Sequence, residues 1–133
     1  MTEPRTWLLD DMTTALSHGA CHLFAAKLYE IFGYPLVACR SADGGIAHCF
    51  AMRGSEGVDA KGPVSRKHFD EEFPYVRMES ISCSDLLSHF RDRFPKEETA
   101  PGESGKTLNQ TILEFADAYI RMRWSIFSPP TKT

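Results

Sequence analysis

The stretch CHLFAAKLYEIFGYPLVACRSADGGIAHCFAMR, residues 21–53, decides the fold of this chain. Its first part places apolar side chains such as Phe24 and Leu28 at helical spacing, which predicts a helix with one buried side. Gly33 stands where a helix commonly ends, and Pro35 prevents the helix from continuing. We therefore expect a helix that starts at the beginning of this stretch and ends at the glycine.

The second part of the stretch has the pattern of a β-hairpin. Apolar runs at residues 35–40 and 46–53 are joined by residues 41–45, which include two glycines, and a loop of this kind connects antiparallel strands. Residues 54–57 are a further turn signal, and residues 58–60 can form a brief third strand. One long helix followed by successive strands predicts an α+β fold, in which the helix packs on a small antiparallel sheet.

Further elements are expected on both sides of this core. In chain order they are a short helix at residues 8–16, a charged stretch at residues 65–73 capped by Ser65, a strand at residues 75–81, a helix that begins after Ser82 or Ser84 and ends at Arg93, and a helix at residues 108–124. Residues 95–106 are expected to form a flexible polar loop, and residues 1–7 and 128–133 to be frayed. The whole chain, residues 1–133, is expected to be one domain.

Size and charge restrict the classes of function. The chain has 133 residues and a net charge of -3, with a pI near 5.9. This balance provides no general positive field, so polynucleotide binding is not expected. No apolar run reaches the roughly 18 residues that a membrane span requires, and the polar N-terminus carries no apolar signal core. We expect a cytoplasmic protein with four reduced cysteines, although secretion by a route without a signal peptide stays open.

Three side chains are expected to carry chemistry. Cys21 opens the predicted helix, where the helix dipole and free N–H groups favour a thiolate and lower the pKa of the thiol. His48 lies in the middle of a strand on a mostly apolar face, and Asp59 lies on the next strand. A nucleophile, a base and a carboxylate that orients the base are the groups that thiol acyl transfer uses. We therefore expect Cys21, His48 and Asp59 to form one catalytic site.

The sequence around these residues resembles the papain-like superfamily in its broad sense, which includes NlpC/P60 hydrolases, transglutaminase-like proteins and small bacterial papain-fold toxin domains. The matching segments lie within residues 17–63 and are Gly19-Ala20-Cys21-His22-Leu23-Phe24-Ala25-Ala26-Lys27-Leu28, Ala47-His48-Cys49-Phe50 and Gly57-Val58-Asp59-Ala60-Lys61-Gly62. The resemblance implies a papain-like core with extra C-terminal helices. It also implies that Cys21 is the nucleophile, His48 the base and Asp59 the orienting acid.

The function that this resemblance implies is that of a thiol-dependent hydrolase or acyl transferase, namely a peptidase, amidase or deamidase. Its substrate is then a protein, a peptide or another amide, and a bacterial effector or toxin-type role is compatible with it. Many papain relatives place a Gln before the cysteine, whereas this chain has Thr13, Thr14 and Ala15 there. The oxyanion hole is therefore expected from the Cys21 backbone N–H and a second donor such as His18. No cofactor is implied, and the oligomeric state stays open.

Other interpretations use the same residues. Buried cysteines and strand histidines are often packing groups. Cys39 and Cys49 are expected to fill the core, and His22 is expected to be a surface or packing residue. The domain can therefore be a catalytically inactive papain-like module that binds a protein partner through the helix at residues 108–124. The apolar stripe of that helix is Leu108, Ile112, Phe115, Tyr119 and Met122.

Two further patterns in the sequence resemble a metal site and a phosphate-binding loop. The pairs Cys21-His22 and His48-Cys49 have a spacing that a tetrahedral metal site rarely uses, so no metal is expected. The string Ala100-Pro101-Gly102-Glu103-Ser104-Gly105-Lys106-Thr107 fits a relaxed phosphate-loop pattern. A phosphate loop needs a buried strand before it, and the preceding residues are charged and contain Pro95. This string is therefore expected to be a polar loop that caps the last helix.

Overall fold

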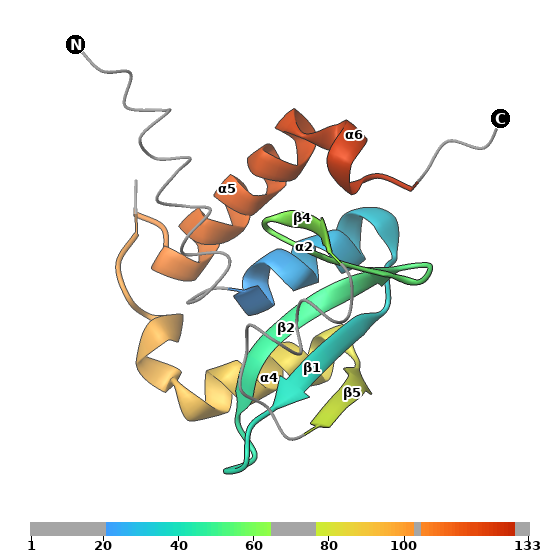
Figure 1. Ribbon diagram of the computed structural model, residues 1–133. Coiled ribbons are helices and arrows are strands. Elements are labelled where there is room, and N and C mark those ends of the chain that lie inside the picture. Colours follow the sequence, from blue (N-terminus) through green and yellow to red (C-terminus); the bar gives the residue numbers. More distant parts are fainter. Residues whose placement is uncertain (1–20, 65–76, 103–104, 130–133) are drawn as a thin grey trace, which may run out of the picture.

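The structure, a computed structural model, describes residues 21–64, 77–102 and 105–129 (Figure 1). Several sequence predictions lie outside the described residues, namely the helix at residues 8–16, the stretch at residues 65–73, His18 as an oxyanion donor, and the frayed ends except for residues 128 and 129. The described residues contain the whole of the stretch at residues 21–53 that the fold prediction rests on.

The long helix, α2, spans Cys21–Phe32. The backbone N–H of Gly33 donates to the carbonyl of Tyr29 at 2.7 Å. Gly33 has a φ of 75°, a left-handed conformation that glycine adopts without strain. The glycine therefore ends α2 as the sequence predicts.

The strands form one sheet of five in the order β4-β3-β2-β1-β5, and all of its pairings are antiparallel. The strands are β1 (Leu36–Arg40), β2 (Ile46–Arg53), β3 (Glu56–Asp59), β4 (Gly62–Val64) and β5 (Arg77–Ile81). The predicted hairpin is confirmed as β1 and β2. The third strand begins two residues earlier than predicted, and β4 was not predicted, because three residues are too few to show a strand period.

The two faces of the sheet bury different side chains, as the alternation along β2 predicts. Cys49 and Ala51 face the main core with α2. Phe50 and Met52 belong to a smaller cluster with Cys39. Figure 1 shows α2 in the middle of the molecule, between the sheet and α5, with α4 below it. The fold is therefore α+β, with the central helix covered on several sides.

The helix before the polar loop is α4 (Cys83–Arg93), and the side-chain oxygen of Ser82 caps it by accepting from the Asp85 N–H at 3.0 Å. This confirms the first of the two predicted caps. The segment at residues 95–106 is more structured than predicted. It begins with a 3-10 helix, η1 (Pro95–Glu98), and Pro101 forms a β-bridge with Thr107.

The predicted helix at residues 108–124 is two helices, α5 (Leu108–Met122) and α6 (Trp124–Phe127). The predicted apolar stripe is only partly right, because Leu108 is 41% exposed and Met122 is 61% exposed. The buried residues of α5 are Thr111, Ala116, Tyr119 and Ile120. The buried face is shifted around the helix axis because α2 packs against the side that carries the small Ala116.

Hydrogen bonds over long sequence distances attach the C-terminal helices to the sheet. The hydroxyl of Tyr34 donates to the Phe127 carbonyl at 2.7 Å, and the hydroxyl of Tyr119 donates to the Ala60 carbonyl at 2.8 Å. The guanidinium of Arg53 donates to two further carbonyls near the end of α6, each at 2.8 Å. These bonds hold α5 and α6 beside β3 and β4, where the candidate site lies.

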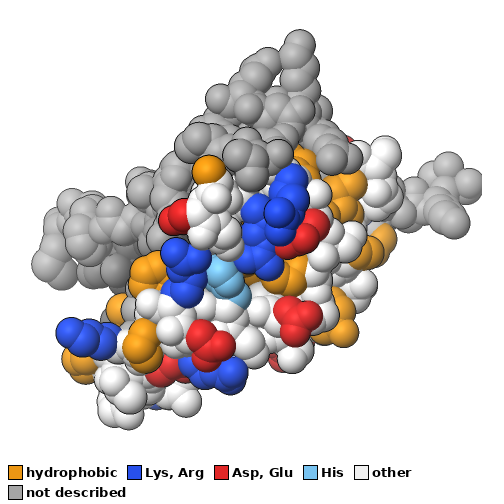
Figure 2. Space-filling view, turned by 90° about the horizontal axis from the view of Figure 1, so that it is seen from below, with side chains coloured by type: hydrophobic (Ala, Val, Ile, Leu, Met, Phe, Trp, Pro, Cys, Tyr) orange, Lys and Arg blue, Asp and Glu red, His pale blue; other side chains and the backbone are white. Residues whose placement is uncertain are grey.

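Charged side chains of both signs are interspersed on the face viewed from below in Figure 2. Arg40 pairs with Glu79 at 2.5 Å, and Arg93 pairs with Asp43 at 3.6 Å. Acidic partners therefore neutralise these arginines. Among the described helices, none is both long and apolar enough to cross a membrane.

Candidate functional site

The packing of α2 positions Cys21. Phe24 and Leu28 anchor the helix in the main core, and α2 lies against β2. Cys21 is the first residue of α2, and Figure 1 shows this helix lying against the sheet. Its side chain is 6% exposed.

The His48 imidazole, on β2, is held by Asp59 at the end of β3. His48 Nε2 lies 3.2 Å from Asp59 Oδ2. The second carboxylate oxygen of Asp59 accepts from the backbone N–H of Lys61 at 2.9 Å. Gly62 then takes a φ of 105° and pairs with Asp59 across the turn. This turn orients the carboxylate toward His48, and it requires a glycine at position 62.

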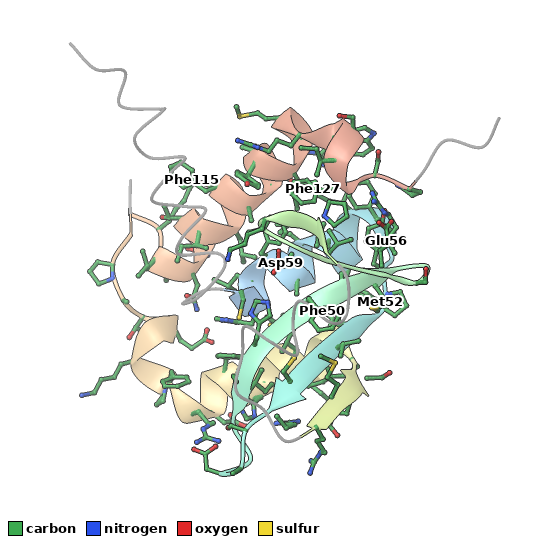
Figure 3. All side chains as sticks on the ribbon, viewed as in Figure 1. Phe50, Met52, Glu56, Asp59, Phe115 and Phe127 are labelled. Atoms are coloured by element: carbon green, nitrogen blue, oxygen red, sulfur yellow. The ribbon has the colours of Figure 1, made fainter. Side chains whose placement is uncertain are left out.

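Figure 3 shows Asp59 near the start of α2, where this helix and β2 come together. Phe50 and Met52 are labelled farther along β2 in the same view. The structure thus brings Cys21 of α2 together with His48 and Asp59 of the consecutive strands β2 and β3.

The pKa of Cys21 lies well below the usual value of a thiol. A hydrogen bond from the Cys49 thiol is the largest cause, burial opposes it, and hydrogen bonding with His48 and the charge of His48 lower the pKa further. Burial lowers the pKa of His48, but hydrogen bonds to Asp59 and Cys21 outweigh it and raise the pKa to about 9. These shifts therefore favour a Cys21 thiolate beside a His48 imidazolium, which is the reactive form of a thiol nucleophile.

Cys49 has a larger part in the site than the sequence analysis predicts. Its Sγ donates to Cys21 Sγ at 3.5 Å. Burial raises the pKa of Cys49 well above its usual value, so Cys49 remains a thiol and a donor. The alternation along β2 does place this side chain on the face toward α2, but a period-two pattern carries no information about which helix residue it meets. Cys39, by contrast, is a core residue on the other face, as predicted.

His22 has a packing role. Its ring stacks on Phe90 with the centroids 3.8 Å apart and an interplanar angle of 6°. Burial lowers the pKa of His22 to about 4, so the ring is neutral at pH 7. It also forms part of the wall of a cavity of about 390 Å³ between α2, α4 and α5, and Cys21 is not among the residues that line this cavity.

The described residues also show parts of the other two patterns. No group of three or more His, Cys, Asp or Glu side chains within it is arranged to hold a metal ion. In the phosphate-loop string, the Gly102 N–H donates to the Lys106 carbonyl, and the Thr107 side chain caps α5. The element that precedes the string is η1 and not a strand. Thr107, the last residue of the string, therefore caps the helix that follows, as predicted.

Comparison with known proteins gives no match: no family model, no curated protein and no solved structure is similar to this chain. The geometry of the site is therefore the basis for a proposal about its chemistry.

Proposed function

We propose that this protein is a thiol-dependent hydrolase or acyl transferase of the papain-like type, acting on an amide of a protein or peptide. The observation that carries the proposal is the set of contacts that joins Cys21, His48 and Asp59. Asp59 holds the imidazole at 3.2 Å, and hydrogen bonding between the imidazole and the Cys21 thiol favours the thiolate. A buried cysteine that served only in packing would have its pKa raised by its surroundings.

In the proposed reaction, the Cys21 thiolate attacks the carbonyl carbon of the amide and forms a carbon–sulfur bond. The His48 imidazolium gives its proton to the leaving nitrogen as the carbon–nitrogen bond breaks. Water or an amine, deprotonated by neutral His48, then attacks the thioester and releases Cys21. Asp59 orients the imidazole and stabilises its charged form throughout. Hydrolysis and acyl transfer differ only in the second acceptor.

The burial of the site bears on how a substrate reaches it. Cys21 is 6% exposed, His48 is 0% exposed and Asp59 is 4% exposed. An amide substrate can reach Cys21 Sγ only if the site opens. A small alkylating reagent needs less opening than a peptide, so it is the appropriate first probe.

The test is the pH dependence of alkylation by iodoacetamide, measured for each cysteine by peptide mass spectrometry. Cys83 is an internal control, because it is less buried than Cys21 and burial raises the pKa of its thiol. At about pH 6 we expect Cys21 to react faster than Cys83, although Cys83 is more accessible, because only Cys21 has an appreciable thiolate fraction. In His48→Ala this advantage should decrease, because the hydrogen bond and the charge of His48 that lower the pKa of Cys21 are lost, whereas the hydrogen bond from Cys49 remains. A Cys21 rate that rises only near pH 8.5, like that of a free thiol, would overturn the proposal.

A second candidate function, a catalytically inactive module that binds a protein partner, is favoured by the same burial and by exposed apolar side chains on the C-terminal helices. Met122 is 61% exposed and Trp124 is 46% exposed. If this function is correct, the Cys21→Ala protein keeps its activity in cells, and the double variant Met122→Ser, Trp124→Ser loses it. If the enzyme proposal is correct, the effects of the two variants are reversed.

A further inference from the structure

Cys49 is a nucleophilic group that the proposed reaction does not consume. Its Sγ lies 3.5 Å from Cys21 Sγ, which is van der Waals contact between two sulfur atoms. The two residues are 28 positions apart in the sequence. One opens α2 and the other lies in the middle of β2, and these two elements pack directly against each other. The fold therefore holds two thiols in contact.

We propose that Cys21 and Cys49 form an intramolecular disulfide on exposure to a peroxide, with Cys49 as the resolving cysteine. A disulfide has a sulfur–sulfur distance of about 2.05 Å. The two sulfurs must therefore approach each other by about 1.5 Å, which small rotations of two short side chains provide. Both sulfurs already lie in one contact between α2 and β2.

The reaction proceeds in two steps that balance. In the first, the Cys21 thiolate attacks one oxygen of hydrogen peroxide, the oxygen–oxygen bond breaks, and the sulfur becomes a sulfenic acid. The hydroxide that leaves takes the proton of the His48 imidazolium and becomes water. In the second step, the Cys49 sulfur attacks the Cys21 sulfur, the sulfur–oxygen bond breaks, and the second hydroxide leaves as water with the Cys49 proton. Two thiols are oxidised by two electrons, and one peroxide is reduced to two waters.

The other two cysteines are placed differently. Cys39 lies in the cluster on the opposite face of the sheet with Phe50. Cys83 opens α4 and is only partly buried. The pairing of Cys21 with Cys49 is therefore specific, and it protects Cys21 from further oxidation to the sulfinic acid, which is not readily reversed.

Formation of the disulfide does not depend on the hydrolase proposal, but its consequence does. If Cys21 is the nucleophile of an amide reaction, the disulfide removes the thiolate and stops the reaction until a reductant restores it. The pair is then a redox switch built into the catalytic site. The experiment below detects the disulfide itself, so it gives a result even if no substrate is turned over.

The experiment treats the full chain with hydrogen peroxide, blocks the remaining thiols with N-ethylmaleimide, and maps the cysteines by mass spectrometry without reduction. We expect a monomer that has lost two hydrogens, and a linked pair of peptides that contain Cys21 and Cys49. Dithiothreitol should return both to the thiol form. In Cys49→Ser, Cys21 should instead gain two oxygens as the sulfinic acid, with a yield several-fold above that of the unchanged protein.

Cys39→Ser is the matched control, since it removes a buried thiol on the other face of the sheet and should leave the Cys21–Cys49 link unchanged. Linked peptides that involve Cys39 or Cys83, or a covalent dimer in place of the monomer, would overturn the proposal. Equal yields of the Cys21 sulfinic acid with and without Cys49 would also overturn it. If Cys49→Ser does not fold, as judged by circular dichroism, the peptide map of the unchanged protein decides alone.

Discussion

His48 is a polar residue in a buried position, so its imidazole needs a hydrogen-bond partner. Its neighbours on the same sheet face, Phe50 and Met52, are apolar, and its side chain is fully buried. Burial of an imidazole without compensation is costly, and Asp59 provides the compensation at 3.2 Å. The contact with Asp59 compensates the burial of the imidazole and also raises its pKa. One contact therefore contributes both to the stability of the fold and to the charged form of His48.

Substitution of Asp59 tests this directly. In Asp59→Asn the carboxylate that stabilises the imidazolium is lost, and burial then lowers the pKa of His48 from about 9 by about one unit or more. The ring signals of His48 in an NMR pH titration measure this change. Asp43→Asn, in the exposed loop between β1 and β2, is the control and should leave the pKa of His48 unchanged. An unchanged value in Asp59→Asn would show that Asp59 does not support the imidazolium.

The pair of Cys21 and His48 also makes stability depend on pH. The pKa of Cys21 is lowered on folding, so its contribution is present above the unfolded value near 8.5 and is lost as the pH falls through the folded value. The pKa of His48 is raised to about 9, so its contribution is complete below about 6.5 and is lost as the pH rises through the folded value.

Together these effects predict a range of pH over which the stabilisation by Cys21 and His48 is constant. The free energy of unfolding contributed by the pair rises with pH up to about 6.5, is level between about 6.5 and 8.5, falls between about 8.5 and 9, and changes little at higher pH. Urea unfolding of the unchanged protein and of Cys21→Ser at a series of pH values gives, as the difference between the two, the part that Cys21 contributes, which should rise with pH up to about 8.5. A difference that does not vary with pH would mean that Cys21 is not ionised in the folded state.

Among the elements, α5 begins where its capping residues predict. Its buried face, however, does not follow from the residues near it in sequence. The Thr107 side chain accepts from the Gln110 N–H at 3.1 Å, and the Gln110 side chain accepts from the Thr107 N–H at 2.9 Å. This reciprocal capping box satisfies two N–H groups at the helix start. The buried side of α5, in contrast, is set by its contact with α2.

Removal of the cap should therefore destabilise α5 by a modest amount. Thr107→Ala is expected to lower the free energy of unfolding by about 1 kcal/mol, as measured by urea denaturation. Thr99→Ala is the matched control, because Thr99 is exposed and follows η1, outside α5. Equal effects of the two substitutions would contradict the role of Thr107.

At the scale of the molecule, the C-terminal helices are attached to the N-terminal half by buried hydrogen bonds. The Tyr34 hydroxyl reaches the Phe127 carbonyl across 93 positions of sequence. Both side chains are buried, and the ring of Phe127 packs edge-on against Phe24 of α2 with the centroids 5.4 Å apart. The last helix thus completes the core that holds α2 in place.

Loss of this hydrogen bond should weaken the whole fold. Tyr34→Phe keeps the ring but leaves the Phe127 carbonyl without its donor, which is expected to cost about 1–3 kcal/mol of unfolding free energy. Chemical denaturation followed by tryptophan fluorescence measures it, with Trp124 of α6 as a reporter near the change. Tyr29→Phe, on an exposed ring, serves as the control. A cost within error of zero for Tyr34→Phe would mean that water replaces the donor.

By itself the sequence determined the elements that depend on near neighbours. The helix that ends at Gly33, the hairpin of β1 and β2, and a serine cap at Ser82 or Ser84 all follow from periodicity, glycine and capping chemistry within a few residues. It also indicated Cys21, His48 and Asp59 as candidates, because their residue types and order have a chemical meaning.

Only the tertiary structure decided the contact of Cys49 with Cys21, the buried face of α5 and the near-complete burial of the candidate site. Each of these depends on where α2 lies against β2 and α5. Local patterns specify which side of an element is apolar, but the partner that covers this side is selected by packing between elements that are distant in sequence. Contacts between distant residues are therefore absent from the local pattern and appear only when the core is assembled.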